Sequence, residues 1–258
     1  MLKMPVSIVI TGASAGLGAA LARAYASRGI WLGLIGRSQV RLTSIAEDCR
    51  AAGATVEILA VDVADFTQME IGIAEWKRVR PIDLIIVNAG IFDGNHPGGE
   101  MESMAAIESQ VRTNLLGLIS TVNAVLPQMR SRGEGTIALI GSLAALQPLA
   151  DAPAYSASKA GAMAYGEALR EYLIPQGVRV ALIYPGHIKT AQVEHHVGTL
   201  PLLLTAEAAA AIIKSGLDRG RSFIAFPWQL LWLIRVGRLV PWRLRAAFGK
   251  GFRFVVQK

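Results

Sequence analysis

The chain has 258 residues, of which 52% are hydrophobic and 17% are charged, and it contains no run of the ~18 uninterrupted apolar residues that predict a membrane-spanning helix. The net charge of +7 comes entirely from residues 227–258, which carry seven basic residues and no acid, whereas the other 226 residues carry 19 of each sign. The domain as a whole therefore gives no reason to expect nucleic-acid binding. The single Cys49 excludes an internal disulfide, and glycines interrupt the apolar N-terminal stretch, so we expect a cytoplasmic protein without an export signal.

The first predicted element is a buried strand over residues 6–10, followed by a glycine-rich turn and a helix that ends near residue 29. The turn reads Thr11-Gly12-Ala13-Ser14-Ala15-Gly16-Leu17-Gly18, with the glycines spaced G-x-x-x-G-x-G. A strand, a glycine turn and a helix start present backbone N–H groups to a pyrophosphate. An ordinary strand-to-helix turn is the alternative, and three glycines in this setting favour the phosphate site.

The second predicted strand, over residues 31–35, ends in Gly36-Arg37-Ser38 without an acidic residue. An acid at this position would bind the ribose 2′-hydroxyl of NAD. An arginine instead suits the additional 2′-phosphate of NADP, through charge-assisted hydrogen bonds. The sequence therefore favours NADP(H) over NAD(H), with a solvated arginine at a helix start as the alternative.

Strands and helices alternate through the rest of the chain. We predict helices over 40–52, 67–79 and 101–130, the last including Asn114, and a helix from about 154 that ends near 175. We predict strands over 56–61, 83–87, 136–140, 178–183 and 222–226. The strands are followed in turn by Asp62-Val63, Asn88-Ala89-Gly90, Gly141-Ser142 and Tyr184-Pro185-Gly186. This alternation predicts a single Rossmann-like α/β domain over residues 1–226, with a doubly wound parallel sheet of seven strands and helices on both faces. In such sheets the site lies beyond the carboxyl ends of the strands.

Tyr155 and Lys159 stand four residues apart in a predicted helix, so their side chains share one face. A phenol has a pKa near ~10, and we expect a fixed ammonium beside it to lower that pKa. The pair is thus a workable general acid and base. In isolation this spacing favours an ordinary surface pair, and the rest of the sequence favours the catalytic interpretation.

Taken together, these features resemble the short-chain dehydrogenase/reductase family in its single-domain, NADP-preferring type. The residues that carry the resemblance run in the family's order and span residues 6 to about 226: the Thr11–Gly18 turn, Asp62, Asn88-Ala89-Gly90, Asn114, Ser142, Tyr155, Lys159, Pro185-Gly186 and Thr190.

The resemblance implies a role for each matching residue. Tyr155 would exchange a proton with the substrate oxygen, Lys159 would lower its pKa and bind the nicotinamide ribose, Ser142 would hydrogen-bond the substrate, and Asn114 would hold a water beside Lys159. The implied cofactor-binding residues are Gly12, Ser14, Ala15, Gly16, Leu17, Gly18, Arg37, Ser38, Asp62, Val63, Asn88, Ala89, Gly90, Tyr155, Lys159, Pro185, Gly186, Ile188 and Thr190. Asn88 partly ties strands together in this family. The resemblance also implies a homodimer or homotetramer formed through the long helices.

Residues 190–205 correspond to the variable segment that covers the substrate in the resembled family. It holds His195-His196 and the apolar run from Leu200 to Leu204. The histidines have no partner at metal-ligand spacing, so we expect no metal site. The apolar run fits either a lid over a partly apolar substrate or ordinary core packing.

The tail over residues 227–258 is unusual for the resembled family. Its tryptophans and leucines precede Arg235 and Arg238, and this composition suits the plane of a membrane interface. A helix docked at a subunit interface is the equal alternative.

The sequence thus predicts an NADP(H)-dependent oxidoreductase that interconverts a carbonyl and a secondary alcohol. We expect a small-molecule substrate that is partly apolar or a cell-envelope precursor, and a protein in the cytoplasm or at the inner face of a membrane. Two alternatives stay open: an epimerase or dehydratase of sugar nucleotides, which the chain is short for, and a non-catalytic NADP-binding regulator or scaffold.

Overall fold

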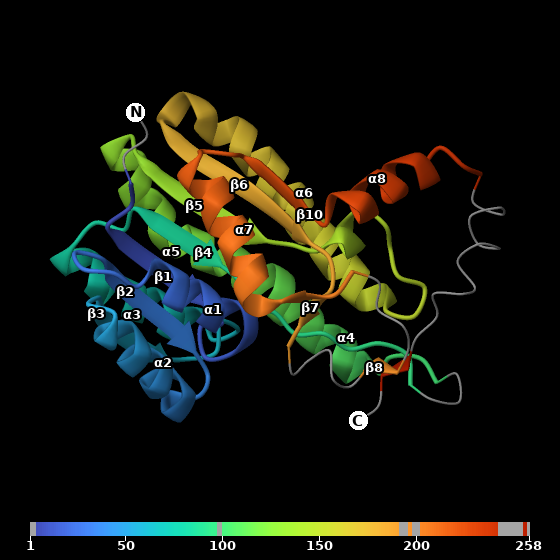
Figure 1. The fold of residues 1–258 in the computed structure, drawn as a ribbon, viewed down its shortest axis with the longest axis horizontal. Helices are drawn as coiled ribbons and strands as arrows, with labels where there is room; N and C mark the ends of the chain where they lie inside the picture. The colour runs from blue at the N-terminus through green and yellow to red at the C-terminus, as the bar shows by residue number, and fades with distance from the viewer. Residues whose placement is uncertain (1–3, 97–99, 191–195, 198–201, 242–254, 257–258) are drawn as a thin grey trace.

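The computed structural model describes residues 4–96, 100–190, 196–197, 202–241 and 255–256 (Figure 1). Its centre is a seven-stranded sheet in the order β10-β6-β5-β4-β1-β2-β3, and every neighbouring pair of these strands is parallel. The strands are β1 Ser7–Thr11, β2 Trp31–Gly36, β3 Thr55–Ala60, β4 Leu84–Val87, β5 Gly135–Ile140, β6 Val178–Pro185 and β10 Phe223–Phe226. The predicted fold class and number of strands are confirmed.

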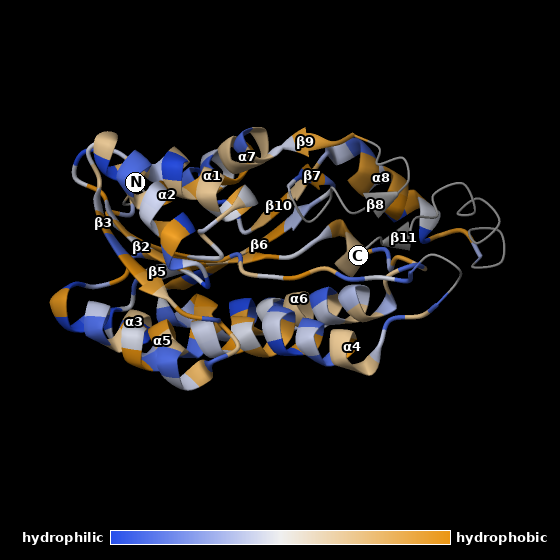
Figure 2. Cartoon of the chain, turned by 90° about the horizontal axis from the view of Figure 1, so that it is seen from below, coloured by the Kyte–Doolittle hydropathy of each residue, from blue (hydrophilic) through white to orange (hydrophobic). Residues whose placement is uncertain are grey.

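Helices cover both faces of this sheet, as Figure 2 shows from below. One face carries α1 Gly16–Tyr25, α2 Gln39–Ala51 and α7 Ala206–Asp218. The other carries α3 Phe66–Val79, α4 Met104–Val111, α5 Gly117–Arg132 and α6 Pro153–Leu173. Each layer has its own hydrophobic core, because strands buried on both faces present apolar side chains to both sets of helices.

The central strands are almost continuously apolar, and their burial explains why these segments pair as strands. All residues of β1, β2 and β4 are buried. β3, at the edge of the sheet, alternates exposed and buried positions at Thr55, Val56 and Glu57. Trp31 of β2 and Trp76 of α3 pack edge to face with ring centres 5.4 Å apart, which fixes α3 on its layer.

The helix predicted over residues 101–130 differs from the structure in its interior. Ser103 accepts a hydrogen bond from the backbone N–H of Ala106 and so begins α4. A π-helical turn over Arg112–Leu116 then separates α4 from α5. The helix ends at Gly133, whose φ of +66° suits glycine. The π turn holds Asn114, and such turns recur at functional sites.

The remaining elements are short. They are the 3₁₀ turns η2 Leu143–Ala145 and η3 Ile174–Gln176, and the short strands β7 Ile188–Lys189, β8 His196–Val197, β9 Leu204–Thr205 and β11 Val255–Val256. The last helix, α8 Trp228–Gly237, follows β10 and stands out from the body in Figure 1. No helix among the described residues is long and apolar enough to cross a membrane.

Candidate active site

The glycine-rich turn after β1 is held against the end of β4 by Asn88. The Asn88 amide donates hydrogen bonds to the carbonyl oxygens of Thr11 at 3.0 Å and Gly12 at 3.4 Å, and the Thr11 hydroxyl accepts from the backbone of Asn88 at 3.0 Å. A Cβ at Gly18 would lie 2.1 Å from the Gly12 carbonyl oxygen, so no side chain fits there. Asn88 therefore ties the strands together, as the family resemblance suggested.

The start of α1 suits a bound anion. Its N-cap residue is Ala15, which offers no side-chain hydrogen bond, and the first turn has no acidic residue. By contrast, Ser38, Asp65, Ser103 and Thr205 cap α2, α3, α4 and α7 through their side chains. The first N–H groups of α1 thus lack a side-chain acceptor at the carboxyl edge of the sheet, where a pyrophosphate would complete them.

Arg37 and Asp62 face each other at the ends of β2 and β3. The Arg37 guanidinium lies 3.9 Å from the Asp62 carboxyl, and its side chain is 67% exposed. Ser38 accepts from the backbone N–H of Arg41 and caps α2, and Val63 is buried in the core. Arg37, Ser38, Asp62 and Val63 thus lie at the carboxyl ends of β2 and β3, on the β3 side of the sheet.

Asn114, in the π turn, joins three segments of the site. Its amide accepts from the backbone N–H of Ile91 at 2.8 Å and donates to the Ile91 carbonyl at 2.9 Å and to the Ser158 hydroxyl at 3.0 Å. The side chain is buried and bonds to protein groups on each of these sides. Asn114 therefore fixes the loop after β4 against α6.

Tyr155 and Ser142 converge beyond the ends of β5 and β6. Ser142 lies close enough to the Tyr155 hydroxyl to lower its pKa by hydrogen bonding, and the Ser142 oxygen accepts from the backbone N–H of Ala144 at 3.0 Å. The ring of Phe92 packs edge to face against Tyr155, with ring centres 4.8 Å apart. Two side chains separated by thirteen positions thus present their oxygens to one point, as predicted.

Lys159 reaches the same region from the next turn of α6. Its ammonium donates to the Ile140 carbonyl at 3.1 Å, lies 5.9 Å from the centre of the Tyr155 ring, and would lie 3.2 Å from a Cβ at Gly90. Burial lowers the pKa of Lys159 to about 8. The ammonium form therefore still predominates at pH 7.

The expected lowering of the Tyr155 pKa by Lys159 is wrong for this structure. Burial raises that pKa above its ordinary value, and the hydrogen bond with Ser142 offsets the rise only in part. Loss of water around the phenolate is the largest cause of the rise, and the Lys159 ammonium donates to the Ile140 carbonyl. Tyr155 is therefore a protonated phenol at neutral pH, ready to donate.

The segment after β6 closes the site on the side of α7. Thr190 lies beside Gly16, where its methyl group would be 3.0 Å from an added Cβ. Gly186 donates its N–H to the Phe226 carbonyl at 2.7 Å, and Ile188 is buried in the core. Pro185 and Gly186 thus lie at the carboxyl edge of the sheet, as expected.

Part of the variable segment lies outside the described residues, including His195, Leu200 and Pro201. Of the predicted apolar run, Leu202 and Leu203 are 48% and 44% exposed, and Leu204 packs on the core. The described residues hold no group of three or more His, Cys, Asp or Glu placed to bind a metal.

Glu102 and Gln110 form a buried polar pair that holds the start of α6, and the sequence analysis did not single them out. Glu102 accepts from the backbone N–H of Ala154, at the start of α6, and from the Gln110 amide at 2.8 Å. Gln110 in turn accepts from the backbone N–H of Asp93. An acid just before a helix gives little signal in a sequence, because its partners lie far along the chain.

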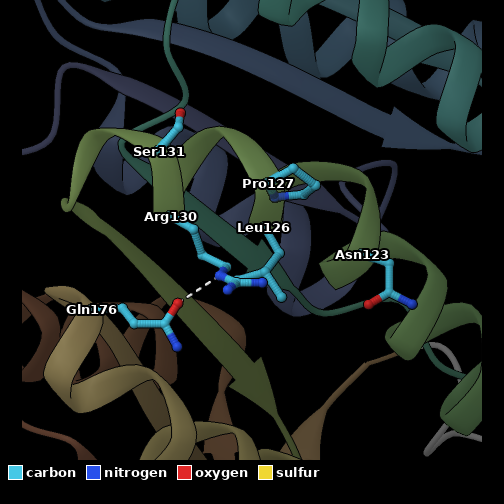
Figure 3. Close-up of a pocket in the computed structure, with 6 residues that line it drawn as sticks. All are labelled: Asn123, Leu126, Pro127, Arg130, Ser131 and Gln176. Carbon is cyan, nitrogen blue, oxygen red and sulfur yellow. Dashed lines mark hydrogen bonds between the residues drawn. The ribbon is translucent and has the colours of Figure 1, made fainter.

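A depression of about 720 Å³ on the outer side of α5 does not belong to this site. It is lined by Asn123, Leu126, Pro127, Arg130, Ser131 and Gln176 (Figure 3). At ~1.5 Å rise per helical residue, Gln176 lies roughly 30 Å along α6 from Tyr155. The depression is shallow, and its lining includes none of the predicted catalytic residues.

The arrangement is that of a known family. A family model described as short chain dehydrogenase matches residues 7–198. The chain belongs to the short-chain dehydrogenase family. This membership confirms the predicted resemblance and makes the chain a member of an oxidoreductase family with the Rossmann-like fold seen here.

Relatives within the short-chain dehydrogenase family share much of the chain. An uncharacterized oxidoreductase of Myxococcus xanthus is 35% identical over 235 residues, which cover 90% of this chain and 92% of that protein. A 3-dehydrosphinganine reductase of Arabidopsis thaliana is 32% identical, over 79% of this chain and 61% of that protein. A solved short-chain dehydrogenase from Sphingobium yanoikuyae, in complex with NADPH, is 28% identical with a TM-score of 0.76, over 90% of this chain and 94% of that one.

Proposed function

We propose that this short-chain dehydrogenase is an NADP(H)-dependent oxidoreductase that interconverts a carbonyl compound and a secondary alcohol. The observation that carries the proposal is the meeting of the Tyr155 and Ser142 hydroxyls beside the Lys159 ammonium. A protonated phenol, a hydrogen-bond donor and a cation around one point suit an oxygen atom that gains negative charge during reaction.

The chain's own groups supply the proton chemistry. Tyr155 donates its proton to the carbonyl oxygen, Ser142 holds that oxygen in line, and the Lys159 ammonium keeps a positive charge 5.9 Å from the Tyr155 ring. In the oxidation direction the Tyr155 phenolate takes the proton back from the alcohol. The nicotinamide cofactor, when bound, supplies or accepts the hydride.

The residues present fit that cofactor. The uncapped start of α1 and the Gly12–Gly18 turn offer backbone N–H groups for its pyrophosphate. Arg37, with a solvent-facing guanidinium at the end of β2, would hold the 2′-phosphate, and Asp62 would lie beside the adenine. The Sphingobium relative was solved with NADPH, which supports the same choice here.

Two groups of relatives support a partly apolar ketone as substrate. Besides the 3-dehydrosphinganine reductase, a ketoacyl reductase of Nostoc is 35% identical, over 70% of this chain and 63% of that protein. Both names describe ketones carried on hydrocarbon chains.

We further propose a homodimer or homotetramer formed through the α4–α5 layer, which light scattering would detect as two or four times 27.5 kDa.

The test is NADPH oxidation across a panel of ketones of increasing chain length, with the Tyr155→Phe variant beside the wild type. We expect turnover by the wild type and a loss of at least about 1000-fold in the variant, since the proton donor is gone while the ring still packs on Phe92. NADPH affinity, measured by fluorescence, should change less than about threefold.

The matched control is Tyr165→Phe, which removes a phenol from the same helix outside the catalytic group. It should keep wild-type turnover. Retained activity in Tyr155→Phe would overturn the assigned role, and NADPH binding without turnover of any carbonyl would favour a non-catalytic regulator.

A further inference from the structure

The helix α8 is apolar on both of its faces. Leu230, Leu231 and Ile234 are partly buried and pack against the core that includes Leu182 and Tyr184 of β6. On the opposite side Trp228 is 70% exposed, Trp232 63% and Leu233 57%, and Leu239 beyond the helix is 85% exposed. Trp228, Trp232 and Val236 are spaced by four and share one face. A surface helix with a docked apolar face normally presents mostly polar residues outward, whereas α8 exposes Trp228, Trp232 and Leu233 beside Gln229 and Arg235.

This exposed face is bordered by positive charge. Arg235 and Arg238 are exposed, and the Arg235 guanidinium lies 5.8 Å from the centre of the Phe223 ring. Residues 227–258 carry seven basic residues and no acid. Tryptophan and leucine next to arginine, without acids, match the interface of an anionic lipid layer, where apolar side chains enter and cations meet the headgroups.

The helix also begins at the rim of the active site. Phe226, two residues before α8, accepts a hydrogen bond from the backbone N–H of Gly186 at 2.7 Å. A Cβ at Gly186 would lie 2.9 Å from Pro227 and 3.4 Å from a Leu230 methyl group. Gly186 follows Pro185 at the carboxyl end of β6, so the start of α8 packs directly against the segment that borders the proposed nicotinamide site.

We propose that α8 docks the protein on an anionic lipid surface, and that the site then takes an amphiphilic ketone whose hydrocarbon part lies in that layer. This deepens the proposed function and rests on it for the substrate, whereas the docking itself does not depend on catalysis. A second copy of the chain fits this face less well, because a twofold contact would bring Arg235 and Arg238 against their own copies without any acid to pair them.

The test uses the full chain in sedimentation with vesicles of phosphatidylcholine alone or with about 30% phosphatidylglycerol. The wild type should bind the mixed vesicles at least about tenfold more tightly than the neutral ones. A Trp228→Ser and Trp232→Ser double variant should lose binding at least about tenfold, and Arg235→Gln with Arg238→Gln roughly 10- to 30-fold. Val79→Ser with Ile174→Ser removes exposed apolar residues elsewhere and should bind as the wild type does.

Two readouts separate docking from catalysis and from assembly. The tryptophan double variant should keep wild-type turnover of a short, soluble ketone and lose turnover of a long-chain ketone held in vesicles. Light scattering should give the same subunit number for both proteins. Equal, weak binding to both vesicle types would overturn the proposal, as would a fall in subunit number in the double variant, which would make α8 a subunit contact. Docking without turnover of any ketone would leave the docking role of α8 standing and refute the proposed function together with the amphiphilic ketone.

Discussion

Arg37 stands at the end of β2, where an acid would select NAD by binding the ribose 2′-hydroxyl. Its guanidinium is largely exposed and only 3.9 Å from Asp62, so a phosphate would find a cation that no close ion pair already satisfies. We predict that Arg37→Ala weakens NADPH binding by roughly 10- to 100-fold and NADH binding by less than about threefold, because one to two charge-assisted hydrogen bonds are lost. Titration of both cofactors checks this.

The control for this prediction is Arg41→Ala, which removes an exposed arginine one turn into α2. It should leave both affinities near those of the wild type. Equal losses for NADPH and NADH in Arg37→Ala would show that Arg37 does not bind the 2′-phosphate.

The burial of Lys159 leads to a second prediction at the residue scale, which concerns how stability depends on pH. Its pKa is about 8 in the folded protein against an ordinary value of 10.5 for a lysine, because burial disfavours the ammonium. Between these values the unfolded chain holds a proton that the folded one has released, so this group makes stability rise with pH from about 8 to 10.5. Below pH ~8 the buried Lys159 ammonium lowers the free energy of unfolding by at most about 3 kcal/mol.

Lys159→Met should therefore unfold at a higher temperature than the wild type at pH ~7, by about 2–6 °C, with the gap closing towards pH ~10. Turnover should be lost. Thermal melts across this pH range measure the effect. A variant that melts lower at neutral pH would mean that the hydrogen bond to Ile140 outweighs the burial of the charge.

At the scale of the element, α6 is held at its start by Glu102. This buried carboxyl group accepts from the Ala154 backbone and from Gln110, so Glu102→Ala leaves two buried donors without partners. We predict a loss of about 2–4 kcal/mol in the free energy of unfolding and lower turnover, since α6 carries Tyr155 and Lys159. Urea unfolding measures the first effect. Glu108→Ala, an exposed acid on α4, should cost less than about 0.5 kcal/mol, and an equal cost in both variants would refute the capping role.

Elements were predicted well where their signals are local. Apolar β-branched runs such as residues 6–10 and the glycines that follow them specify strand, turn and helix within a few positions. The π turn at Asn114 could not be predicted, because the helical pattern of the sequence continues through it. The contacts that Asn114 makes with Ile91 and Ser158 come from segments far along the chain. The role of Glu102 could not be predicted for the same reason, since its partner Ala154 lies 52 residues away.

At the scale of the whole molecule, the parallel sheet explains why residues far apart in sequence share one site. The carboxyl ends of β1, β4, β5 and β6 meet at one edge, which brings Gly12, Asn88, Ser142 and Pro185 together. The order of these residues in the sequence was enough to predict their meeting. The sequence order was not enough to predict the environment of these side chains. The raised pKa of Tyr155, for example, depends on burial that only the packed structure shows.

The central claim is that a hydride and a proton reach the two ends of one carbonyl at this site. Its most direct test is incubation with NADPH deuterated at nicotinamide C4 and a panel of ketones, followed by mass spectrometry of the alcohols. We predict one deuterium on the carbinol carbon with the wild type and no product above background with Tyr155→Phe. Products without deuterium, formed equally by both proteins, would contradict the account.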